Sequence, residues 1–130
     1  MAEMQVELVA VERRIWSGPA RMVVARTTDG DIGVLPGHAP LLAQLQEGFA
    51  ARIVEADGTE LNVAVHGGFL SVTKQKVSIL AEGAELADEI DIAAARTAYD
   101  EAVRAGDDSD EQRETLRRAR ARLLAAGQSV

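Results

Sequence analysis

Two histidines and one pair of aspartates are the side chains of this chain with the most evident capacity for chemistry. His38 and His66 each suit a general base or a metal ligand, but neither has a second histidine or a carboxylate at metal-binding spacing. Asp29 and Asp31 flank a glycine and suit acid–base work in principle, although this pattern is more typical of a solvated turn. There is no cysteine, no nucleophile elbow and no glycine-rich phosphate loop. We therefore expect a protein that is not an enzyme and holds no metal.

Charge and hydropathy exclude further classes of function. The 130 residues include 14 Lys and Arg against 21 Asp and Glu, and the net charge of −7 would repel phosphate backbones. We therefore expect no nucleic-acid partner. No apolar run approaches the ~18 residues of a membrane span, and the N-terminus lacks a basic region followed by an apolar stretch. These features predict a soluble protein made in a cytoplasm.

The chain divides into two parts of different composition near residues 83–90. Before residue 87 lie 9 of the 11 glycines, all three prolines and 19 valine, isoleucine and threonine residues. From residue 87 onward there are 11 alanines and few β-branched side chains. Glycine and proline between β-branched runs are typical of short strands, whereas alanine, arginine and leucine favour helices. We expect two domains, a β domain over residues 1–86 and a helical domain over residues 87–130.

The β domain is predicted to hold seven or more short strands separated by turn signals. Asp57-Gly58, for example, is a common hairpin dipeptide, because both central residues of that turn need a positive φ. So many antiparallel strands cannot bury both faces in one sheet, which favours an antiparallel β-sandwich or flattened barrel. The expected strands cover residues 5–11, 21–27, 32–35, 49–55, 60–66, 69–73 and 76–81.

The helical domain is predicted to be an antiparallel hairpin of two amphipathic helices joined at residues 106–108. The first helix begins after Asp88 or Asp91, and the second begins after Ser109, which forms a capping-box pattern with Gln112. Gly106 and Gly127 end the two helices. The expected apolar stripes are narrow and rich in alanine, so little area is buried: Ile92, Ala95, Tyr99, Ala102 and Val103 on the first helix, and Leu116, Ala119 and Leu123 on the second.

Charge is divided unequally between these helices. Residues 88–105 carry five acids and two arginines, a net charge of −3, whereas residues 111–124 carry two acids and five arginines, a net charge of +3. The two helices should attract each other. The second helix is also a basic surface on an acidic protein, which suits an acidic partner if the helix leaves its dock.

The segment from residue 30 to residue 42 is predicted to be a stiff, shaped loop. Pro36 and Pro40 fix φ, Gly37 permits a tight reversal, and apolar residues follow a polar tip. Rigid loops on β scaffolds are common places for partner contacts, although a simple corner between sheets explains most of the pattern. His38 is the residue that a corner explains least.

Three segments, at residues 16–18, 30–41 and 65–70, carry a further signal. They read Trp-Ser-Gly, Gly-Asp-Ile-Gly-Val-Leu-Pro-Gly-His-Ala-Pro-Leu and Val-His-Gly-Gly-Phe-Leu. In sequence and position they resemble the epsilon subunit of the F-type ATP synthase, as does the order of β domain and helical hairpin. The resemblance covers essentially the whole chain. The preference for alanine and arginine, with Lys74 and Lys76 the only lysines, is similar to that of an actinobacterial member.

The resemblance implies a noncatalytic subunit of the rotating central stalk, peripheral at the cytoplasmic face of the bacterial cell membrane. In that family the sandwich is held against the gamma subunit and rests on the polar loops of the c-ring. It thereby couples the ring to gamma during proton-driven ATP synthesis, and only these partners attach it to the membrane. Carried over to this chain, the positions that face gamma and the c-ring are Gly30, Asp31, Ile32, Gly33, Pro36, Gly37, His38, Ala39 and Pro40.

The resemblance also implies that the helical hairpin is a regulatory switch. In the family the docked hairpin is silent, and the extended one reaches the catalytic alpha and beta subunits and restrains ATP hydrolysis. The basic contacts with the beta subunit would be Arg113, Arg117, Arg118, Arg120 and Arg122. These arginines equally suit a solvated helix surface on which they pair with Glu111 and Glu114, and single exposed pairs of that kind contribute only about 0.2–1 kcal/mol.

Some bacterial members of the family bind ATP at the hairpin through an Ile/Leu-Asp-x-x-Arg-Ala motif. This chain begins the motif with Ile90 and Asp91, but Ala94 stands at the arginine position. Arg96 lies two residues later, about 200° further around the helix. We therefore expect no cofactor and no regulatory ATP, with Asp91 and Arg96 as the only nucleotide-binding candidates.

A second class of function is a free-standing binding module. In this alternative, a small acidic β-sandwich uses its Pro-Gly-His-Ala-Pro loop to bind a soluble protein and carries an unrelated helical tail. Recovery of gamma and the c-ring with the chain from solubilised membranes separates the two hypotheses.

Overall fold

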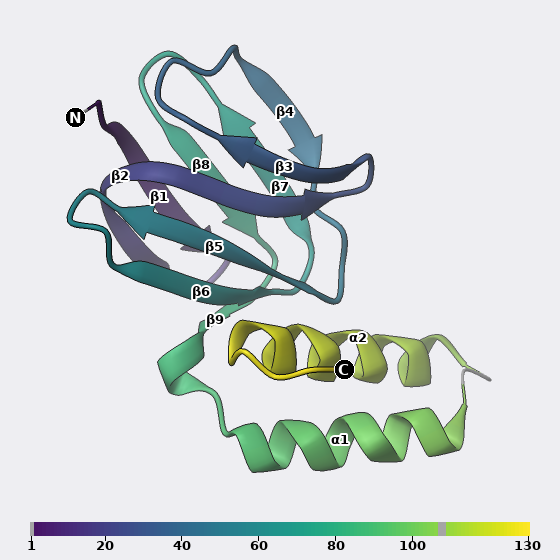
Figure 1. Cartoon of the computed structure of the whole chain (residues 1–130). Coiled ribbons are helices and arrows are strands. Elements are labelled where there is room, and N and C mark those ends of the chain that lie inside the picture. The colour runs from purple at the N-terminus through teal and green to yellow at the C-terminus, as the bar shows by residue number, and fades with distance from the viewer. Residues whose placement is uncertain (1, 107–108) are drawn as a thin grey trace.

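A computed structural model describes residues 2–106 and 109–130, in which a β-sandwich lies above two helices (Figure 1). The expected fold, an antiparallel β-sandwich followed by a two-helix hairpin, is confirmed. Of the connection predicted between the helices, Gly106 is described, whereas Asp107 and Asp108 lie outside the described residues, as does Met1. The division into two domains stays a prediction.

The sandwich is a single sheet that folds over on itself. Within the described residues it has nine strands: β1 (Met4–Ala10), β2 (Arg14–Thr27), β3 (Gly30–Val34), β4 (Leu41–Gln44), β5 (Phe49–Glu55), β6 (Glu60–Val65), β7 (Gly68–Val72), β8 (Val77–Ala81) and β9 (Ala84–Leu86). Their order is β4-β7-β8-β1-β2-β5-β6-β9, and β3 pairs with the free side of β2. The pairing of β1 with β8 is parallel, whereas the other named strand pairs are antiparallel.

Strand β2 belongs to both layers. Its first half pairs with β1 in the layer of β4, β7 and β8, and its second half lies between β3 and β5 in the other layer (Figure 1). The sequence predicts this strand at residues 21–27 only, because Gly18 and Pro19 suggest a break. Pro19 instead sits opposite Gln5, next to a register shift between Ala20 and Met22, and an irregularity of this kind tolerates a missing N–H.

The segment from residue 30 to residue 42 is not one loop, which corrects the prediction. Residues 30–34 form strand β3, in register with β2 from Thr27↔Gly30 to Val23↔Val34, and residues 41–44 form β4 against β7. Only residues 35–40 connect them. Both strands are short and β3 contains two glycines, so neither shows an alternating pattern long enough to predict its full extent. The three-residue β9 was missed for the same reason.

The core lies between the two layers and is aliphatic. Its largest fully buried side chains include Leu8, Ile53, Leu70 and Ile79, which come from strands of both layers. Strand alternation explains this, because successive side chains point to opposite faces and one face of each layer is covered by the other. Among the described residues, the buried polar side chains are Thr27, His66 and Ser78.

The two helices begin and end where the capping signals predict. After a 3-10 turn at Ala87–Glu89, α1 (Ile92–Ala105) begins at Asp91, whose Oδ1 accepts a hydrogen bond from the Ala94 amide at 3.0 Å. Asp91, rather than Asp88, is therefore the N-cap. Helix α2 (Asp110–Ala125) begins at Ser109, whose Oγ accepts from the Gln112 amide at 3.1 Å. Gly106 follows α1 with a φ of 79°.

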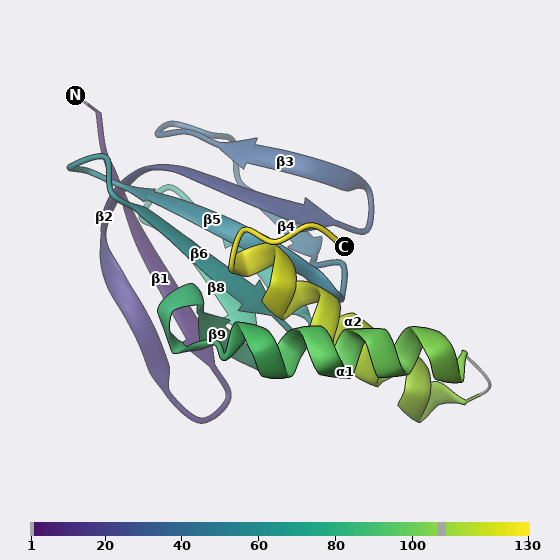
Figure 2. The ribbon, with the colours of Figure 1, turned by 60° about the horizontal axis from the view of Figure 1, so that its bottom comes forward.

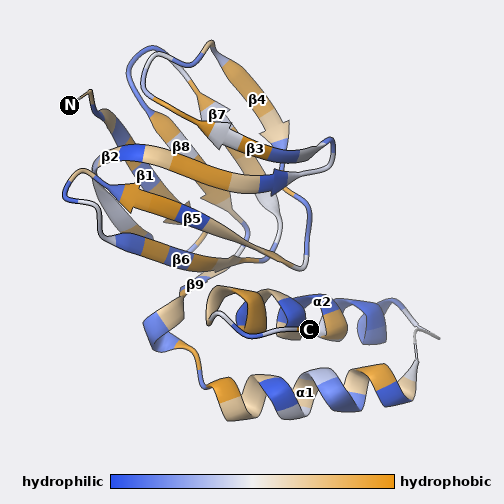
Figure 3. Cartoon of the chain, in the orientation of Figure 1, coloured by the Kyte–Doolittle hydropathy of each residue, from blue (hydrophilic) through white to orange (hydrophobic). Residues whose placement is uncertain are grey.

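Helix α2 lies between the sandwich and α1 (Figure 1), and α1 crosses in front of it when the lower side of the molecule is turned forward (Figure 2), so α2 is buried on two opposite sides. Ala119 and Leu123 form the row that the sequence predicts. Ala121 and Ala125 lie two positions further, about 200° around the helix, and pack against Ala64 of β6. Ala50 and Ile90 complete this group, which we call the alanine cluster. The row of Ala121 and Ala125 was missed because it continues into an arginine, Arg117. Hydrophilic and hydrophobic segments alternate along α2 in Figure 3.

Candidate partner-binding surfaces and the docked hairpin

The first candidate surface is at the start of β3, where four of the predicted partner-binding residues lie: Gly30, Asp31, Ile32 and Gly33. Asp31 stands directly opposite Arg26 of β2, and its Oδ1 accepts a hydrogen bond from Arg26 Nε at 2.6 Å. The Asp31 side chain is nevertheless 70% exposed. Its carboxylate is held in place and still accessible to a cationic group of a partner.

The second candidate surface is the turn at residues 35–40, which holds Pro36, Gly37, His38, Ala39 and Pro40. The His38 amide donates to the Leu35 carbonyl at 3.1 Å, and Gly37 takes a φ of 86°. The His38 ring donates through Nδ1 to the Ala39 carbonyl at 2.7 Å, because a carbonyl oxygen can only accept. The turn is therefore tightly held, as the prolines predict.

A cleft of about 360 Å³ lies beside this turn, between the start of β1 and the turn that joins β7 to β8. Both lysines of the chain, Lys74 and Lys76, line it together with His38. Glu3 lines the same cleft and Lys76 Nζ is 3.1 Å from Glu7 Oε2, so carboxylates balance part of this positive charge.

The two candidate surfaces are separate, although the sequence suggests one loop. Asp31 is the second residue of β3, whereas His38 lies four residues past the end of that strand. A strand advances about 3.3 Å per residue, so β3 sets the two side chains at opposite ends of the sandwich layer.

A third surface was not predicted from the sequence. Leu42, Phe69 and Leu80 lie on the outer side of β4, β7 and β8 and are 69%, 47% and 43% exposed. Phe69 is paired with Leu80 across the sheet, and Leu42 is one strand further, opposite Ser71. We call these three residues the outer apolar face. The alternation of Phe69 and Ser71 with apolar neighbours is visible in the sequence, but a sequence does not show which layer a helix leaves uncovered.

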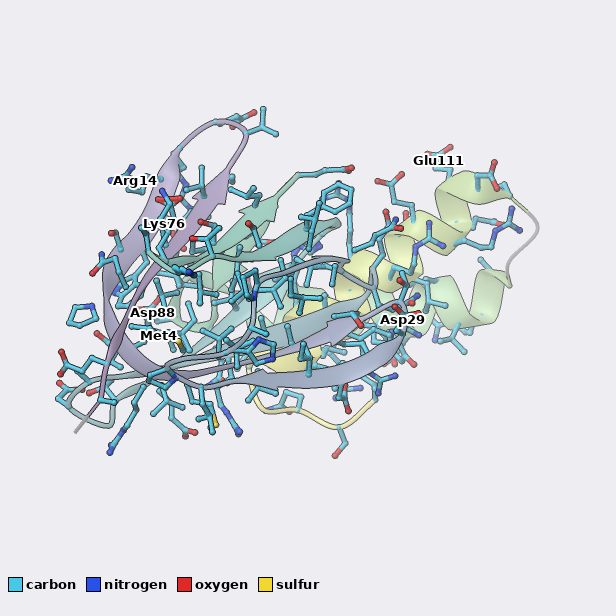
Figure 4. All side chains as sticks on the ribbon, turned by 90° about the horizontal axis from the view of Figure 1, so that it is seen from above. Met4, Arg14, Asp29, Lys76, Asp88 and Glu111 are labelled. Atoms are coloured by element: carbon cyan, nitrogen blue, oxygen red, sulfur yellow. The ribbon has the colours of Figure 1, made fainter. Side chains whose placement is uncertain are left out.

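Glu7 of β1 is the centre of a polar cluster with Ser78, Lys76 and Arg14, in the layer that contains β4, β7 and β8. Glu7 accepts a hydrogen bond from Ser78 Oγ at 3.0 Å and forms an ion pair with Lys76 Nζ at 3.1 Å. Arg14, beside Lys76 in Figure 4, is 3.9 Å from the other carboxylate oxygen. The hydrogen bonds from Lys76 and Ser78 lower the pKa of Glu7.

Basic residues of α2 bind the sandwich in this docked arrangement. Arg117 Nε is 2.9 Å from Glu47 Oε2, and Arg120 Nε donates to the Gly48 carbonyl at 2.9 Å. The Arg120 guanidinium also lies over the Phe49 ring, 4.5 Å from its centroid. Gly48 has a φ of 88°, and a Cβ added there would come within 2.4 Å of Arg120 Nη2, so this contact needs glycine.

Arg122 makes the third contact, to a carboxylate that is shared with a buried histidine. Glu85 Oε1 accepts from Arg122 Nε at 2.7 Å and from His66 Nε2 at 2.9 Å. Burial is the largest cause that lowers the pKa of His66, and the charges of Arg118 and Arg122 lower it further. The hydrogen bond to Glu85 raises this pKa, but only in part offsets the shift. Burial alone would raise the pKa of Glu85, but the bonds from His66 and Arg122 outweigh it and lower the pKa. The docked state therefore favours a neutral His66 beside an ionised Glu85.

The remaining two of the five arginines pair within α2. Arg118 Nε donates to Glu114 Oε1 at 3.2 Å across one turn, and Arg113 pairs with Asp110. The alternative interpretation, a solvated helix with local pairs, thus describes Arg118, whereas Arg117, Arg120 and Arg122 are held by the sandwich. Sequence analysis missed Glu47, His66 and Glu85 as partners because they are distant in the chain from α2.

The two nucleotide-binding candidates have structural roles here. Asp91 caps α1, and Arg96 Nη2 donates to the Ser129 carbonyl at 2.7 Å. In the described part of the chain, no group of three or more His, Asp or Glu residues is arranged to hold a metal ion. Nor is either described helix long and apolar enough to cross a membrane.

Comparison with known proteins covers almost the whole of this architecture. The family described as "ATP synthase, Delta/Epsilon chain, beta-sandwich domain" matches residues 3–87. The ATP synthase epsilon chain of Mycobacterium avium is 50% identical over 127 residues, 98% of each chain. The chain belongs to the ATP synthase epsilon chain family.

Further relatives of this epsilon chain family agree with that assignment. The ATP synthase epsilon chain of Rhodococcus opacus is 59% identical over 108 residues, which are 83% of this chain and 86% of the relative. Both relatives are actinobacterial, as the composition suggests. A chain of the Euglena gracilis mitochondrial ATP synthase structure, OSCP/F1/c-ring, superposes with a TM-score of 0.79 at 25% identity, over 98% of this chain and 83% of that one. The comparisons do not support a free-standing binding module.

Proposed function

We propose that this epsilon chain is a noncatalytic stalk subunit that couples the c-ring to the gamma subunit during ATP synthesis. The observation that carries the proposal is the match with the epsilon chain of Mycobacterium avium over 98% of each chain. It is supported by three accessible surfaces of the sandwich: the outer apolar face, the turn at residues 35–40 and the exposed Asp31 carboxylate on β3. The same proposal places the subunit at the cytoplasmic face of the cell membrane, held there by its partners.

The outer apolar face fits the gamma subunit. Three large apolar side chains on neighbouring strands, each more than two fifths exposed, form the kind of patch that protein partners cover. Gamma is the partner that the family resemblance assigns to the sandwich, and the turn at His38 lies at the edge of the same layer, since it leads into β4.

Asp31, with Gly30, Ile32 and Gly33, fits the polar loops of the c-ring. Its carboxylate is exposed and oriented by Arg26, and a strand is a stiffer base than a free loop. A stiff contact suits a coupling element, because a soft one would take up rotation as bending.

The hairpin fits a regulatory arm that reaches the catalytic subunits when it is released. Arg117, Arg120 and Arg122, which bind the sandwich when docked, are then free for acidic groups of the beta subunit. Regulation by ATP is not part of the proposal, because Asp91 and Arg96 already have structural partners. Calorimetry of the isolated chain with ATP tests this point.

The test is recovery of the complex from solubilised membranes with variant chains. Phe69→Glu should reduce recovery of gamma, Asp31→Arg should reduce recovery of the c-ring, and His38→Ala should weaken both. Glu60→Arg, an exposed change on β6, is the control and should leave recovery unchanged. Normal recovery of gamma and the c-ring with all three variants would refute the proposal.

A further inference from the structure

Two arginines from separate elements of the molecule meet at one aromatic ring. Arg26 of β2 and Arg120 of α2 each place the guanidinium carbon 4.5 Å from the centroid of Phe49. These carbons are therefore at most 9.0 Å apart, twice the 4.5 Å distance. Two cations repel each other, and because this upper limit is close to the Debye length of about 8 Å at physiological salt, the repulsion is only partly screened.

Asp31 offsets this repulsion from the sandwich side. Its Oδ1 accepts from Arg26 Nε at 2.6 Å, and the antiparallel register of β2 and β3 sets the two residues directly opposite each other. The carboxylate therefore compensates the charge of Arg26, the cation that shares the Phe49 ring with Arg120. Docking of α2 brings Arg120 to a ring whose other cation is already compensated.

On the helix side, Arg120 has few alternatives to this position. Its Nε donates to the Gly48 carbonyl at 2.9 Å, and the missing side chain of Gly48 provides the room. The Arg120 guanidinium cannot move away from Phe49 without losing that hydrogen bond. A change in the charges around the Phe49 ring therefore alters the stability of the docked α2, because Arg120 does not reorient independently of the helix.

We propose that Asp31 and the helical hairpin are energetically coupled through Arg26, Phe49 and Arg120, so that a cationic partner group bound to Asp31 favours release of the hairpin. A cation at Asp31 competes with Arg26 for the carboxylate. Arg26 then stands less compensated beside Arg120, and the docked state loses stability relative to the released one. By thermodynamic reciprocity, release of the hairpin strengthens the binding of a cation at Asp31 by the same factor.

The structure supplies the elements that a coupling of this kind requires. There are two distinct places, the exposed carboxylate on β3 and the α2 dock on β5 and β6, and a chain of direct contacts between them. Which partner supplies the cation rests on the proposed function. The coupling itself lies within one chain, so a test on the isolated chain separates failure of the coupling from failure of the proposed function.

The experiment is hydrogen exchange of α2 amides in the full chain, comparing wild type with Asp31→Asn. The uncompensated Arg26 charge would then repel Arg120 across the ring, and Coulomb repulsion at this separation, partly screened by water and salt, predicts exchange about two- to fivefold faster over residues 110–125, with the sandwich amides unchanged. Glu60→Gln is the matched control, because it removes an exposed carboxylate from an ion pair with Arg52 that includes neither Phe49 nor Arg120.

A second background tests the route. In Arg120→Gln chains the Asp31→Asn change should no longer alter the exchange of α2, because the second cation at the ring is gone. The proposal is overturned if Asp31→Asn leaves α2 exchange at the wild-type rate or slows it. It is also overturned if exchange rises equally in the sandwich, or if the effect persists without Arg120.

Discussion

Glu85 provides the most direct test of what holds the hairpin on the sandwich. Glu85→Gln keeps the shape of the side chain but removes the negative charge to which both Arg122 and His66 donate. Of these two hydrogen bonds, only the one from Arg122 connects the sandwich to α2. Fully buried hydrogen bonds to charged groups contribute about 1.5–3 kcal/mol, and fully exposed ion pairs about 0.2–1 kcal/mol. Here the Arg122 and Glu85 side chains are 34% and 31% exposed, which places the loss between these cases. We expect about 1–1.5 kcal/mol, a roughly five- to twelvefold increase in the released fraction.

The assay uses the absence of native cysteines. A thiol placed by Ala121→Cys, at a position with no exposed surface in the docked state, can react with a labelling reagent only when α2 leaves the sandwich. The rate of labelling relative to an unfolded peptide measures the released fraction. Glu114→Gln is the control: it removes a pair internal to α2, which contributes about 0.2–0.5 kcal/mol, so labelling should change by less than about threefold. Equal labelling rates in the two variants, or a change below about twofold for Glu85→Gln, would refute the assignment.

Three further predictions concern the same junction. Gly48→Ala should speed labelling of the thiol introduced by Ala121→Cys, because its methyl group displaces Arg120. Gly37→Ala has a similar positive φ of 86° but open space around it, so it should cost comparable backbone strain without releasing α2. Denaturant titration of both variants measures the strain, and thiol labelling measures the release. The pKa of His66 is lower in the folded chain than its ordinary value of 6.5, so the free energy of unfolding that depends on neutral His66 is fully present above pH 6.5 and is lost as pH decreases through the folded pKa. Urea midpoints measured at decreasing pH below 6.5 should therefore fall in wild type and fall less in His66→Gln. Truncation of residues 107–130 should raise the ATP hydrolysis rate of the complex, and an unchanged rate would contradict a regulatory role for α2.

The capping signals and the chain-wide composition change are sufficient to predict the helices. Asp91, Ser109 and Gly106 act through their own backbone neighbours, so their effect is visible in a few adjacent residues. Strand boundaries are less accessible. Pro19 suggests a break because proline lacks an N–H, but the register shift beside it removes the need for that donor, and only the paired strands β1 and β5 reveal the shift.

The candidate sites show the same division between local and distant causes. The turn at Pro36 and Pro40 was predicted to be held tightly, and the His38 contacts agree. The arginines of α2 were identified as a basic row, but their docked partners could not be. Glu47 and Glu85 are brought to the helix by β5, β6 and β9, through pairings between residues far apart in the chain.

The alanine cluster has a consequence for what happens after the hairpin leaves. Separation of α2 from the sandwich uncovers mainly methyl groups, at Ala50, Ala64, Ala121 and Ala125. The larger apolar groups at this junction are Ile90 and the face of the Phe49 ring that Arg120 covers. Exposed small methyl groups on a surface rich in charge give little tendency to self-association, whereas large apolar patches do. The hairpin of the proposed function can therefore detach and return without promoting self-association in either position.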